Sequence, residues 1–582
     1  MAKRTGAQIT DVFRQLLEEH PLYRSSRDPG SMISPTAFLD AANRMWRAQP
    51  GTLSAWADIW QAYQTDTFKL WSQMIPTPGA KRTPVIEAGN DPRFKDESWS
   101  DNPFYDFIKQ SYLLSVRAIV DTADKAQLPA KEQRRLSFYA RLATDALAPS
   151  NFASTNPKVL ARAVETKGQS LIDGFRHMLD DLQKGYISTT DESAFEVGKN
   201  LATTEGAVIY RNDLIELIQY KPRAEMVSDR PLVIVPPCVN KFYIFDLNER
   251  KSMIRYALEQ ERNVFIISWR NPGPKQRDWN WDKYVQDGVF RAFEVAQAVA
   301  KAEKVDAVAW CNGGTLMTVA LAVMSKEQRG SIASATLLSS MIDFSDPGEI
   351  EVFLDPQGSA QYDRKLGLTG VLPGKELAQA MAMLHANESI WNFVVNNYLM
   401  GQAPAPFDVL YWNSDTSNLP AEWYRYYAEN MYQANKLREP GGLTILGKPV
   451  DTHQIDVPCY MLAGLGDHIV PWRTSYLARD LVGGDVEFVL TDGGHVSGTV
   501  INHPVKNRRH FFVGGKEGAG PDAWKETAEH HEGSWWPHWL QWLDQQGGAA
   551  RIPAPTGLGD EMHPALAPAP GTYVLESVPQ RY

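Results

Sequence analysis

The N-terminal third of the chain carries apolar residues at the spacing of amphipathic helices. Between residues 53 and 74 they recur every three or four positions, as at Trp56, Ile59 and Trp60, which places them on one side of a helix. The same pattern covers residues 104–122, 130–147 and 157–184. The first 190 residues are therefore predicted to form an all-helical domain.

The pattern changes after residue 185 to short apolar runs separated by polar and glycine-containing segments. These runs cover residues 232–236, 263–268, 305–310, 333–339, 458–463 and 486–490. Helical patterns lie between most of them, for example at 287–303 and 314–326. Alternating buried strands and helices predict an α/β domain over residues 191–582 with a mostly parallel, doubly wound sheet.

Two segments of this second domain do not fit the alternation. The interval 341–457 is rich in aromatic residues and asparagine, as at Trp391, Tyr398 and Trp412, and is predicted to be an inserted cap. The tail from about residue 552 is rich in proline and glycine, so we expect it to be extended and mobile.

Composition and charge exclude several classes of function. The 582 residues include 59 Lys and Arg against 69 Asp and Glu, a formal charge of −10 without a long basic stretch, which disfavours nucleic-acid binding. The start lacks a secretory apolar segment, and no run of about 18 apolar residues could span a membrane. Three cysteines cannot form a disulfide framework. We expect a cytoplasmic protein without a membrane span.

A cysteine stands where a strand turns sharply into a helix. The apolar run 305–310 leads into Cys311-Asn312-Gly313-Gly314 and then into an apolar helical pattern. This is the context in which α/β-hydrolases carry their nucleophile, in a G-x-S-x-G type of motif. The small residues admit neighbouring backbone close to the turn. Ala309 replaces the first glycine of the motif, and no G-x-S-x-G offers a competing serine.

An acid and a histidine follow in the expected chain order. Asp467 comes after the strand pattern 458–463, and His495 comes after 486–490, both beside glycines. We expect Cys311 to act as nucleophile, His495 as general base and then acid, and Asp467 to fix the imidazole tautomer.

Four further residues are candidates for roles around this triad. We expect the backbone N–H groups of Asn312 and Val239 to form the oxyanion hole. Cys238 is expected to line the wall of the site, and Ser497, two residues past His495, to line the acyl pocket.

Cysteine in place of serine favours one kind of chemistry. An acyl group that moves from a thioester donor onto a thiol remains a thioester, whereas a serine ester would be a deeper trap. The motif therefore favours acyl transfer from coenzyme A thioesters over ester hydrolysis, provided that the aromatic cap excludes water. Coenzyme A would then be part of the substrate and a product, and no separate cofactor is expected.

Other residues that could carry chemistry have simpler interpretations. His468 could replace His495, but it directly follows the acid and is expected to point elsewhere; Cys459, inside a strand, is expected to be a core residue. His530, His531, Glu532 and His538 lack the H-E-x-x-H spacing of a zinc site. The glycine-containing segment 442–449 has a proline where a phosphate loop needs Ser or Thr. We expect no metal site.

Six short motifs carry a resemblance to a known family. They are P-S-N-F at 149–152, T-D-E-S-A-F at 190–195, P-P-C-V-N-K at 236–241, S-W-R-N-P at 268–272, D-H-I-V-P-W at 467–472 and G-S-W-W-P at 533–537. With the cysteine box, they make the chain from about residue 145 onward resemble the polyhydroxyalkanoate synthases, most like the class I type that needs no partner subunit. The first 100 residues match weakly.

The resemblance implies a fold, an activity and partners. It implies an α/β-hydrolase fold and a cytoplasmic acyltransferase that polymerises (R)-3-hydroxyacyl-CoA into polyhydroxyalkanoate with release of CoA. It implies a homodimer bound to the surface of polyester granules, and a triad of Cys311, Asp467 and His495, the residues also reached from spacing. In this family the aspartate is also proposed to help activate the 3-hydroxyl group of the incoming acyl unit.

Two other functions are compatible with the sequence. A cysteine-dependent thioesterase or hydrolase on the same fold would release soluble hydroxy acid instead of polymer. A non-catalytic granule-associated scaffold would retain the fold but release no CoA.

Overall fold

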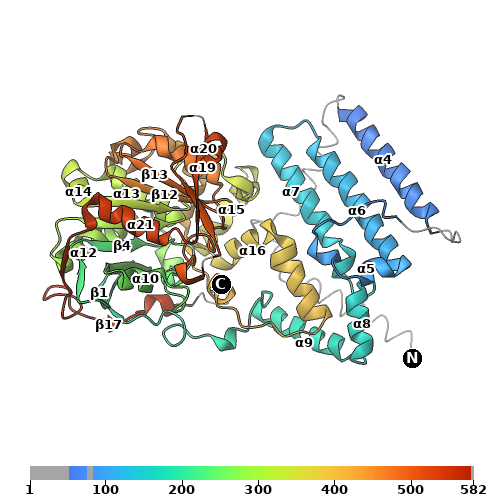
Figure 1. Ribbon diagram of the computed structural model, residues 1–582, viewed down its shortest axis with the longest axis horizontal. Coiled ribbons are helices and arrows are strands. Elements are labelled where there is room, and N and C mark those ends of the chain that lie inside the picture. Colours follow the sequence, from blue (N-terminus) through green and yellow to red (C-terminus); the bar gives the residue numbers. More distant parts are fainter. Residues whose placement is uncertain (1–51, 75–82, 355, 507, 519, 578–582) are drawn as a thin grey trace. The chain divides into compact units, whose positions relative to one another are not determined.

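The chain folds into two compact units. The computed structural model describes residues 52–74, 83–354, 356–506, 508–518 and 520–577. Of these described residues, the first unit comprises those up to Asp191 together with Gln379–Ala405, and the second comprises those in Glu192–Ala378 and from Pro406 onward (Figure 1). The region that the sequence indicates as one inserted cap, 341–457, thus contributes to both units.

The first unit is helical, as predicted. Its helices before the first strand are α4 (Thr52–Ser72), α5 (Ser98–Asp101), α6 (Pro103–Asp124), α7 (Ala130–Ala146), α8 (Pro157–Glu165) and α9 (Gln169–Lys184). The pattern at 157–184 forms two helices instead of one. Lys167 and Gly168 have φ angles of 51° and 86°, and this left-handed backbone ends α8 before α9 begins.

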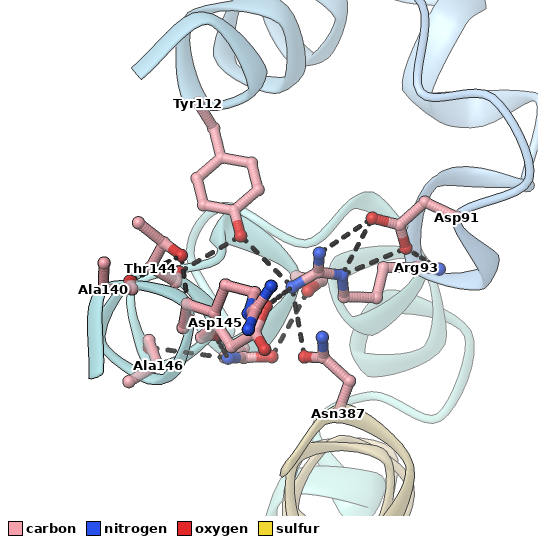
Figure 2. Close-up of polar contacts among 11 residues, drawn as sticks. Asp91, Arg93, Tyr112, Ala140, Thr144, Asp145, Ala146 and Asn387 are labelled. Carbon is pink, nitrogen blue, oxygen red and sulfur yellow. Dashed lines mark hydrogen bonds and ion pairs between the residues drawn. The ribbon is translucent and has the colours of Figure 1, made fainter. Parts of the chain in front are cut away.

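A half-buried arginine connects the elements of this unit (Figure 2). The Arg93 guanidinium is ion-paired with Asp91 at 2.8 Å and with Asp145 at 3.1 Å. It also donates to the hydroxyl of Tyr112 and to the side-chain oxygen of Asn387, each at 3.1 Å. Asn387 belongs to the segment 379–405, so this one side chain ties that segment to α6 and α7.

The same segment packs closely on α9. A Cβ at Gly174 in α9 would lie 1.9 Å from the carbonyl oxygen of Tyr398, so only glycine allows this approach. The Tyr398 hydroxyl donates to Asp181 at 2.7 Å, and the Asn397 amide donates to the carbonyl oxygen of Ser188 at 2.8 Å. Residues 379–405 are therefore an integral part of the helical unit.

The second unit is built on an eleven-stranded sheet with the order β15-β14-β13-β12-β7-β6-β4-β5-β2-β1-β17. Its six central strands are parallel: β5 (Asn263–Trp269), β4 (Pro231–Val235), β6 (Val305–Trp310), β7 (Ile332–Leu338), β12 (Cys459–Gly464) and β13 (Val486–Thr491). These are the six strands that the apolar runs predict, within about one residue at each end. The predicted mostly parallel sheet is confirmed in its centre.

Antiparallel strands extend the sheet at both edges. They are β1 (Gly206–Arg211), β2 (Ile215–Tyr220), β14 (His510–Val513), β15 (Glu529–Glu532) and β17 (Ala567–Pro568). Short strands outside this sheet form the pairs β3 (Met226–Ser228) with β16 (Arg551–Pro553), β8 (Val371–Leu372) with β9 (Leu419–Pro420), and β10 (Thr444–Ile445) with β11 (Lys448–Pro449).

Helices cover both faces of the sheet. On one face a large apolar core joins β4, β5 and β6 to α10 (Met253–Glu259) and α21 (Trp536–Leu543), with Trp535, Trp536 and Trp539 fully buried. On the other, α12 (Arg291–Ala300) and α13 (Asn312–Val323) pack against β4 and β6 (Figure 1). The remaining helices are α11 (Trp281–Lys283), α14 (Lys326–Gly330), α15 (Pro356–Thr369), α16 (Gly374–Leu384), α17 (Asp408–Ser414), α18 (Ala421–Tyr427), α19 (Trp472–Leu477) and α20 (Pro521–Thr527).

The C-terminal tail is extended, as expected, but it is fastened to the sheet instead of being loose. Strand β17 pairs with β1, and Pro568 is accommodated because an edge strand does not need every N–H. The N–H groups of Thr572 and Tyr573 donate to the fully buried carboxylate of Glu216, at 2.8 and 2.9 Å. Among the described residues, no helix is long and apolar enough to cross a membrane.

Candidate active site

Cys311 lies at a strained turn between β6 and α13. Its φ and ψ angles are 56° and −134°, a backbone conformation that costs about 1–3 kcal/mol in a residue other than glycine. The Cys311 N–H donates to the carbonyl oxygen of Leu338 in the adjacent strand at 3.0 Å. The turn therefore holds Cys311 at the carboxyl edge of the parallel strands, where ligands bind in open α/β sheets.

The small residues around Cys311 allow this turn. A Cβ at Gly313 would lie 2.6 Å from the carbonyl oxygens of Val235 and Pro236, and one at Gly314 would lie 1.9 Å from the Ser340 hydroxyl. Ala309, the residue that departs from the usual motif, lies fully buried within β6. Its methyl group is accommodated in the strand, so the departure leaves the turn intact.

The structure brings Asp467 and His495 together. Asp467 follows β12 and His495 follows β13, and the two are joined by a hydrogen bond of 2.7 Å between His495 Nδ1 and Asp467 Oδ2. The other carboxylate oxygen, Oδ1, accepts the N–H groups of Ile469 and Val470, each at 2.9 Å. Both oxygens of this buried carboxylate are thus engaged.

Electrostatics in the pair favour a charged imidazole. Burial would lower the pKa of His495, but the Asp467 carboxylate and the Cys311 sulfur raise that pKa to about 10. Burial would likewise raise the pKa of Asp467, yet His495 and the two backbone N–H groups hold it below its ordinary value. The Cys311 sulfur thus lies near enough to His495 to act on the pKa of the ring. Sulfur, imidazole and carboxylate are therefore neighbours, with His495 hydrogen-bonded to Asp467.

An aromatic ring packs on the imidazole of His495. Trp310, the residue before Cys311, is buried, and its ring centroid lies 5.0 Å from that of His495 at an angle of 32°. Trp412 in α17 packs on Trp310 in turn, at 6.0 Å. The sequence analysis did not single out Trp310, because an aromatic residue at the end of a buried strand is an ordinary core feature.

One predicted oxyanion donor, Asn312, directly follows Cys311, and the other, Val239, follows a residue that is hydrogen-bonded to Asn312. Asn312 is the first residue of α13, so its N–H has no acceptor within the helix. Its side chain accepts the N–H of Cys238 at 3.0 Å. The next residue, Val239, lies outside regular helix and strand. Its N–H has no hydrogen-bond acceptor among the described residues.

Cys238 lies close to Cys311 but is a different kind of thiol. It is 4% exposed, and burial, together with the nearby Cys311 sulfur, raises the pKa of the Cys238 thiol well above its ordinary value. Its position is compatible with the wall of the site. A buried thiol whose pKa is raised is a poor nucleophile.

Two tyrosines, Tyr427 and Tyr432, approach Cys311 from the segment predicted as cap. Burial, reinforced by the Cys311 sulfur, raises the pKa of both hydroxyls, and their rings pack edge-on at 5.1 Å. They bring two buried aromatic side chains close to the sulfur. The many aromatic residues of this region predicted an aromatic cover. They did not predict which rings would lie near the cysteine.

The other candidate residues are placed as follows. His468 is exposed, unlike the buried Asp467 and His495. Cys459 is fully buried in β12 and donates to the carbonyl oxygen of Val457. Ser497 is half-buried in the tight loop after His495, with its hydroxyl 4.0 Å from the Cβ position of Gly494; its role in an acyl pocket stays a prediction.

No group of three or more His, Cys, Asp or Glu side chains in the described part of the chain is arranged to hold a metal ion. His530 and His531 lie on β15, where His531 stacks on Phe511. The ring of His538 contacts the Tyr460 hydroxyl at 3.1 Å.

Two family models match the chain. The model described as the N-terminus of poly-beta-hydroxybutyrate polymerase (PhaC) matches residues 90–257, and the model for the alpha/beta hydrolase fold matches residues 231–498. Among solved structures, an enol-lactonase from Burkholderia xenovorans is similar at 13% identity. That match covers 49% of this chain and 91% of the other, with a TM-score of 0.26.

Curated relatives cover most of the chain. The poly(3-hydroxyalkanoate) polymerase subunit PhaC of Cupriavidus necator is 42% identical over 89% of this chain and 88% of its own length. The poly(3-hydroxyalkanoate) polymerase of Methylorubrum extorquens is 37% identical over 98% of this chain and 96% of its own. With its hydrolase-type sheet and the cysteine at the turn after β6, this chain belongs to the poly(3-hydroxyalkanoate) polymerase family of acyltransferase-type enzymes.

Proposed function

We propose that the protein polymerises (R)-3-hydroxyacyl-CoA into polyhydroxyalkanoate and carries the growing chain as a thioester on Cys311. The observation that carries this proposal is the Cys311 sulfur at the strained turn, near His495, whose ring is hydrogen-bonded to Asp467. The names of the relatives, which are poly(3-hydroxyalkanoate) polymerases, support the substrate class.

The first half-reaction loads the cysteine. His495 takes the thiol proton, and the sulfur attacks the thioester carbonyl of the acyl-CoA. The N–H groups of Asn312 and Val239 would hold the oxyanion that forms. The carbon–sulfur bond to CoA then breaks, His495 returns the proton to the departing thiolate, and the acyl group remains on Cys311.

The second half-reaction extends the polyester. The 3-hydroxyl group of one acyl unit loses its proton and attacks the thioester carbonyl of another, so that an ester forms and a thiol is released. We assign the proton transfer to His495, because both oxygens of Asp467 are already engaged with His495, Ile469 and Val470. Asp467 then acts through the imidazole by fixing its tautomer and stabilising its charge.

The aromatic cover over Cys311 supports polymerisation over hydrolysis. Tyr427 and Tyr432 lie near the sulfur, and Trp412 packs on Trp310, which in turn contacts His495. A cover of this kind limits the access of water to the acyl-enzyme. The hydroxyl of the next acyl unit would then be the favoured acceptor.

The test is the product formed from (R)-3-hydroxybutyryl-CoA by the purified protein. Polymerisation requires release of CoA together with insoluble polymer, and Cys311→Ala must abolish both. Soluble 3-hydroxybutyrate as the sole product would instead identify a thioesterase, and granule binding without CoA release would identify a scaffold.

The location and assembly of the protein are part of the same proposal. We propose a cytoplasmic homodimer on the surface of polyester granules, supported by the family to which the chain belongs. Sedimentation of the purified protein with and without substrate tests the dimer, and fractionation of granules from producing cells tests the attachment. A monomer throughout turnover would overturn the dimer.

A further inference from the structure

The loop that carries Val239 is held at almost every residue. The carbonyl oxygen of Pro236 accepts the indole N–H of Trp269 at 2.9 Å, and the N–H of Cys238 donates to the Asn312 side chain. The carbonyl oxygen of Val239 accepts the N–H of Ser417 at 3.2 Å. The N–H of Val239 has no acceptor among the described residues, which is what an oxyanion donor requires.

A buried lysine, Lys241, anchors the C-terminal end of this loop. Lys241 is 7% exposed, and its ammonium group has three oxygen partners. It donates to the carbonyl oxygens of Val574 and Glu576, at 2.6 and 2.9 Å, and it is ion-paired with Asp415 at 2.9 Å. Its own carbonyl oxygen accepts the indole N–H of Trp412 at 2.8 Å.

The three partners of Lys241 come from distant parts of the second unit. Asp415 ends α17, and its second oxygen accepts the hydroxyl of Tyr243 at 3.0 Å. Val574 and Glu576 belong to the C-terminal tail. Asn240 forms a β-bridge with Thr416, so the loop and the segment after α17 run side by side. One ammonium group thus joins the loop to the cap region and to the tail.

The contacts of Lys241 point to a role beyond general stabilisation of the fold. An ammonium ion that is removed from water is costly unless every donor is paired. Here the ammonium group has two hydrogen bonds and one ion pair, and Lys241 is two residues from Val239 and its N–H group. Displacement of an oxyanion donor by about 1 Å is enough to lose most of its effect.

We infer that Lys241 is a positioning residue that fixes the Val239 N–H over Cys311 by coupling the loop to Asp415 and to the C-terminal tail. This inference rests on the proposed function, because it concerns the oxyanion of the same acyl transfer. It gives the C-terminal tail a role in catalysis without any tail residue touching the substrate.

The test compares two reactions of the same sulfur. Acylation by (R)-3-hydroxybutyryl-CoA needs the oxyanion hole, whereas alkylation by iodoacetamide is a direct displacement that forms no oxyanion. In Lys241→Met we expect the rate of CoA release per alkylatable Cys311 to fall about 100-fold. The rate of Cys311 alkylation, followed by peptide mass spectrometry, should stay within about twofold of the wild type, since His495 and Asp467 are untouched.

Lys251→Met is the matched control. Lys251 forms an ion pair with Asp408, at the other end of α17, at 2.5 Å, so the variant removes a similar pair from the same helix without touching the loop. It should show no difference between the two reactions. Asp415→Asn is a second variant that keeps the shape of the site, and it should show a smaller difference in the same direction as Lys241→Met.

Three outcomes are informative. A selective loss of acylation in Lys241→Met and Asp415→Asn, absent from Lys251→Met, supports the positioning role. Equal loss of acylation and alkylation, or loss of neither, overturns it; if Lys241→Met does not fold, Asp415→Asn decides by the same criterion. A wild-type protein that releases no CoA at all would instead remove the proposed function.

Discussion

Replacement of Asp467 by asparagine should disable the imidazole without removing it. The carboxylate uses Oδ1 for the N–H groups of Ile469 and Val470 and Oδ2 for His495 Nδ1. An asparagine has one oxygen and one NH₂ group, so it must choose which neighbours receive the oxygen. If the oxygen stays with the two backbone N–H groups, the NH₂ group faces His495.

The size of the effect follows from this choice. An NH₂ group at Nδ1 requires the tautomer that carries its proton on Nε2, and that proton prevents His495 from accepting the thiol proton of Cys311. The alternative orientation leaves two backbone N–H groups unsatisfied, at about 1–3 kcal/mol each. The productive arrangement is therefore about 2–6 kcal/mol less stable, which corresponds to a loss of roughly 30-fold to 10⁴-fold in rate.

The assay measures CoA release from (R)-3-hydroxybutyryl-CoA and, separately, the alkylation of Cys311 by iodoacetamide. Both rates should fall in Asp467→Asn, because both need the thiol to be deprotonated. Asp492→Asn, which neutralises a carboxylate three residues before His495, is the control and should retain both rates within about threefold. Rates for Asp467→Asn within threefold of the wild type, in a folded protein, would refute the reasoning.

Three further predictions concern the same site. Gly313→Ala would place a Cβ 2.6 Å from two backbone oxygens, so we expect it to lower the free energy of unfolding by about 1–3 kcal/mol, measured by denaturant titration; an unchanged midpoint would contradict the close approach. The raised pKa of His495 predicts that its pairing with Asp467 stabilises the fold fully below pH 6.5, its unfolded pKa, and that this stabilisation is lost as the pH rises through about 10. The difference in Tm between wild type and Asp467→Asn should therefore shrink between pH 7 and pH 10, and a constant difference would argue against the raised pKa. His468→Ala should release CoA at the wild-type rate, since the side chain is exposed, whereas a loss as large as that of His495→Ala would make His468 the base.

The sequence predicts the centre of the sheet better than its edges. Each central strand is buried on both faces and shows as a continuous apolar run, such as 305–310, which the structure reproduces residue for residue as β6. The edge strands β14 and β15 are short and carry polar residues such as His510, His530 and Glu532. Their pairing depends on neighbours far away in the chain, and no local pattern records it.

The residues of the candidate site also differ in how well the sequence predicts them. Cys311, Asp467 and His495 follow strands at positions that the fold reserves for chemistry, so spacing alone points to them. Lys241 and Trp310 matter through contacts with Asp415, the C-terminal tail and the imidazole. Contacts of this kind appear only when segments more than 150 residues apart in sequence are brought together.

The mass of the protein during turnover tests the central claim most directly. After brief mixing with (R)-3-hydroxybutyryl-CoA, rapid acid quenching and digestion, the peptide that contains Cys311 should carry one or more 3-hydroxybutyryl units. Hydroxylamine should remove them, as expected for a thioester. CoA release and polymer formation with no adduct on that peptide, or undiminished in Cys311→Ala, would contradict the account.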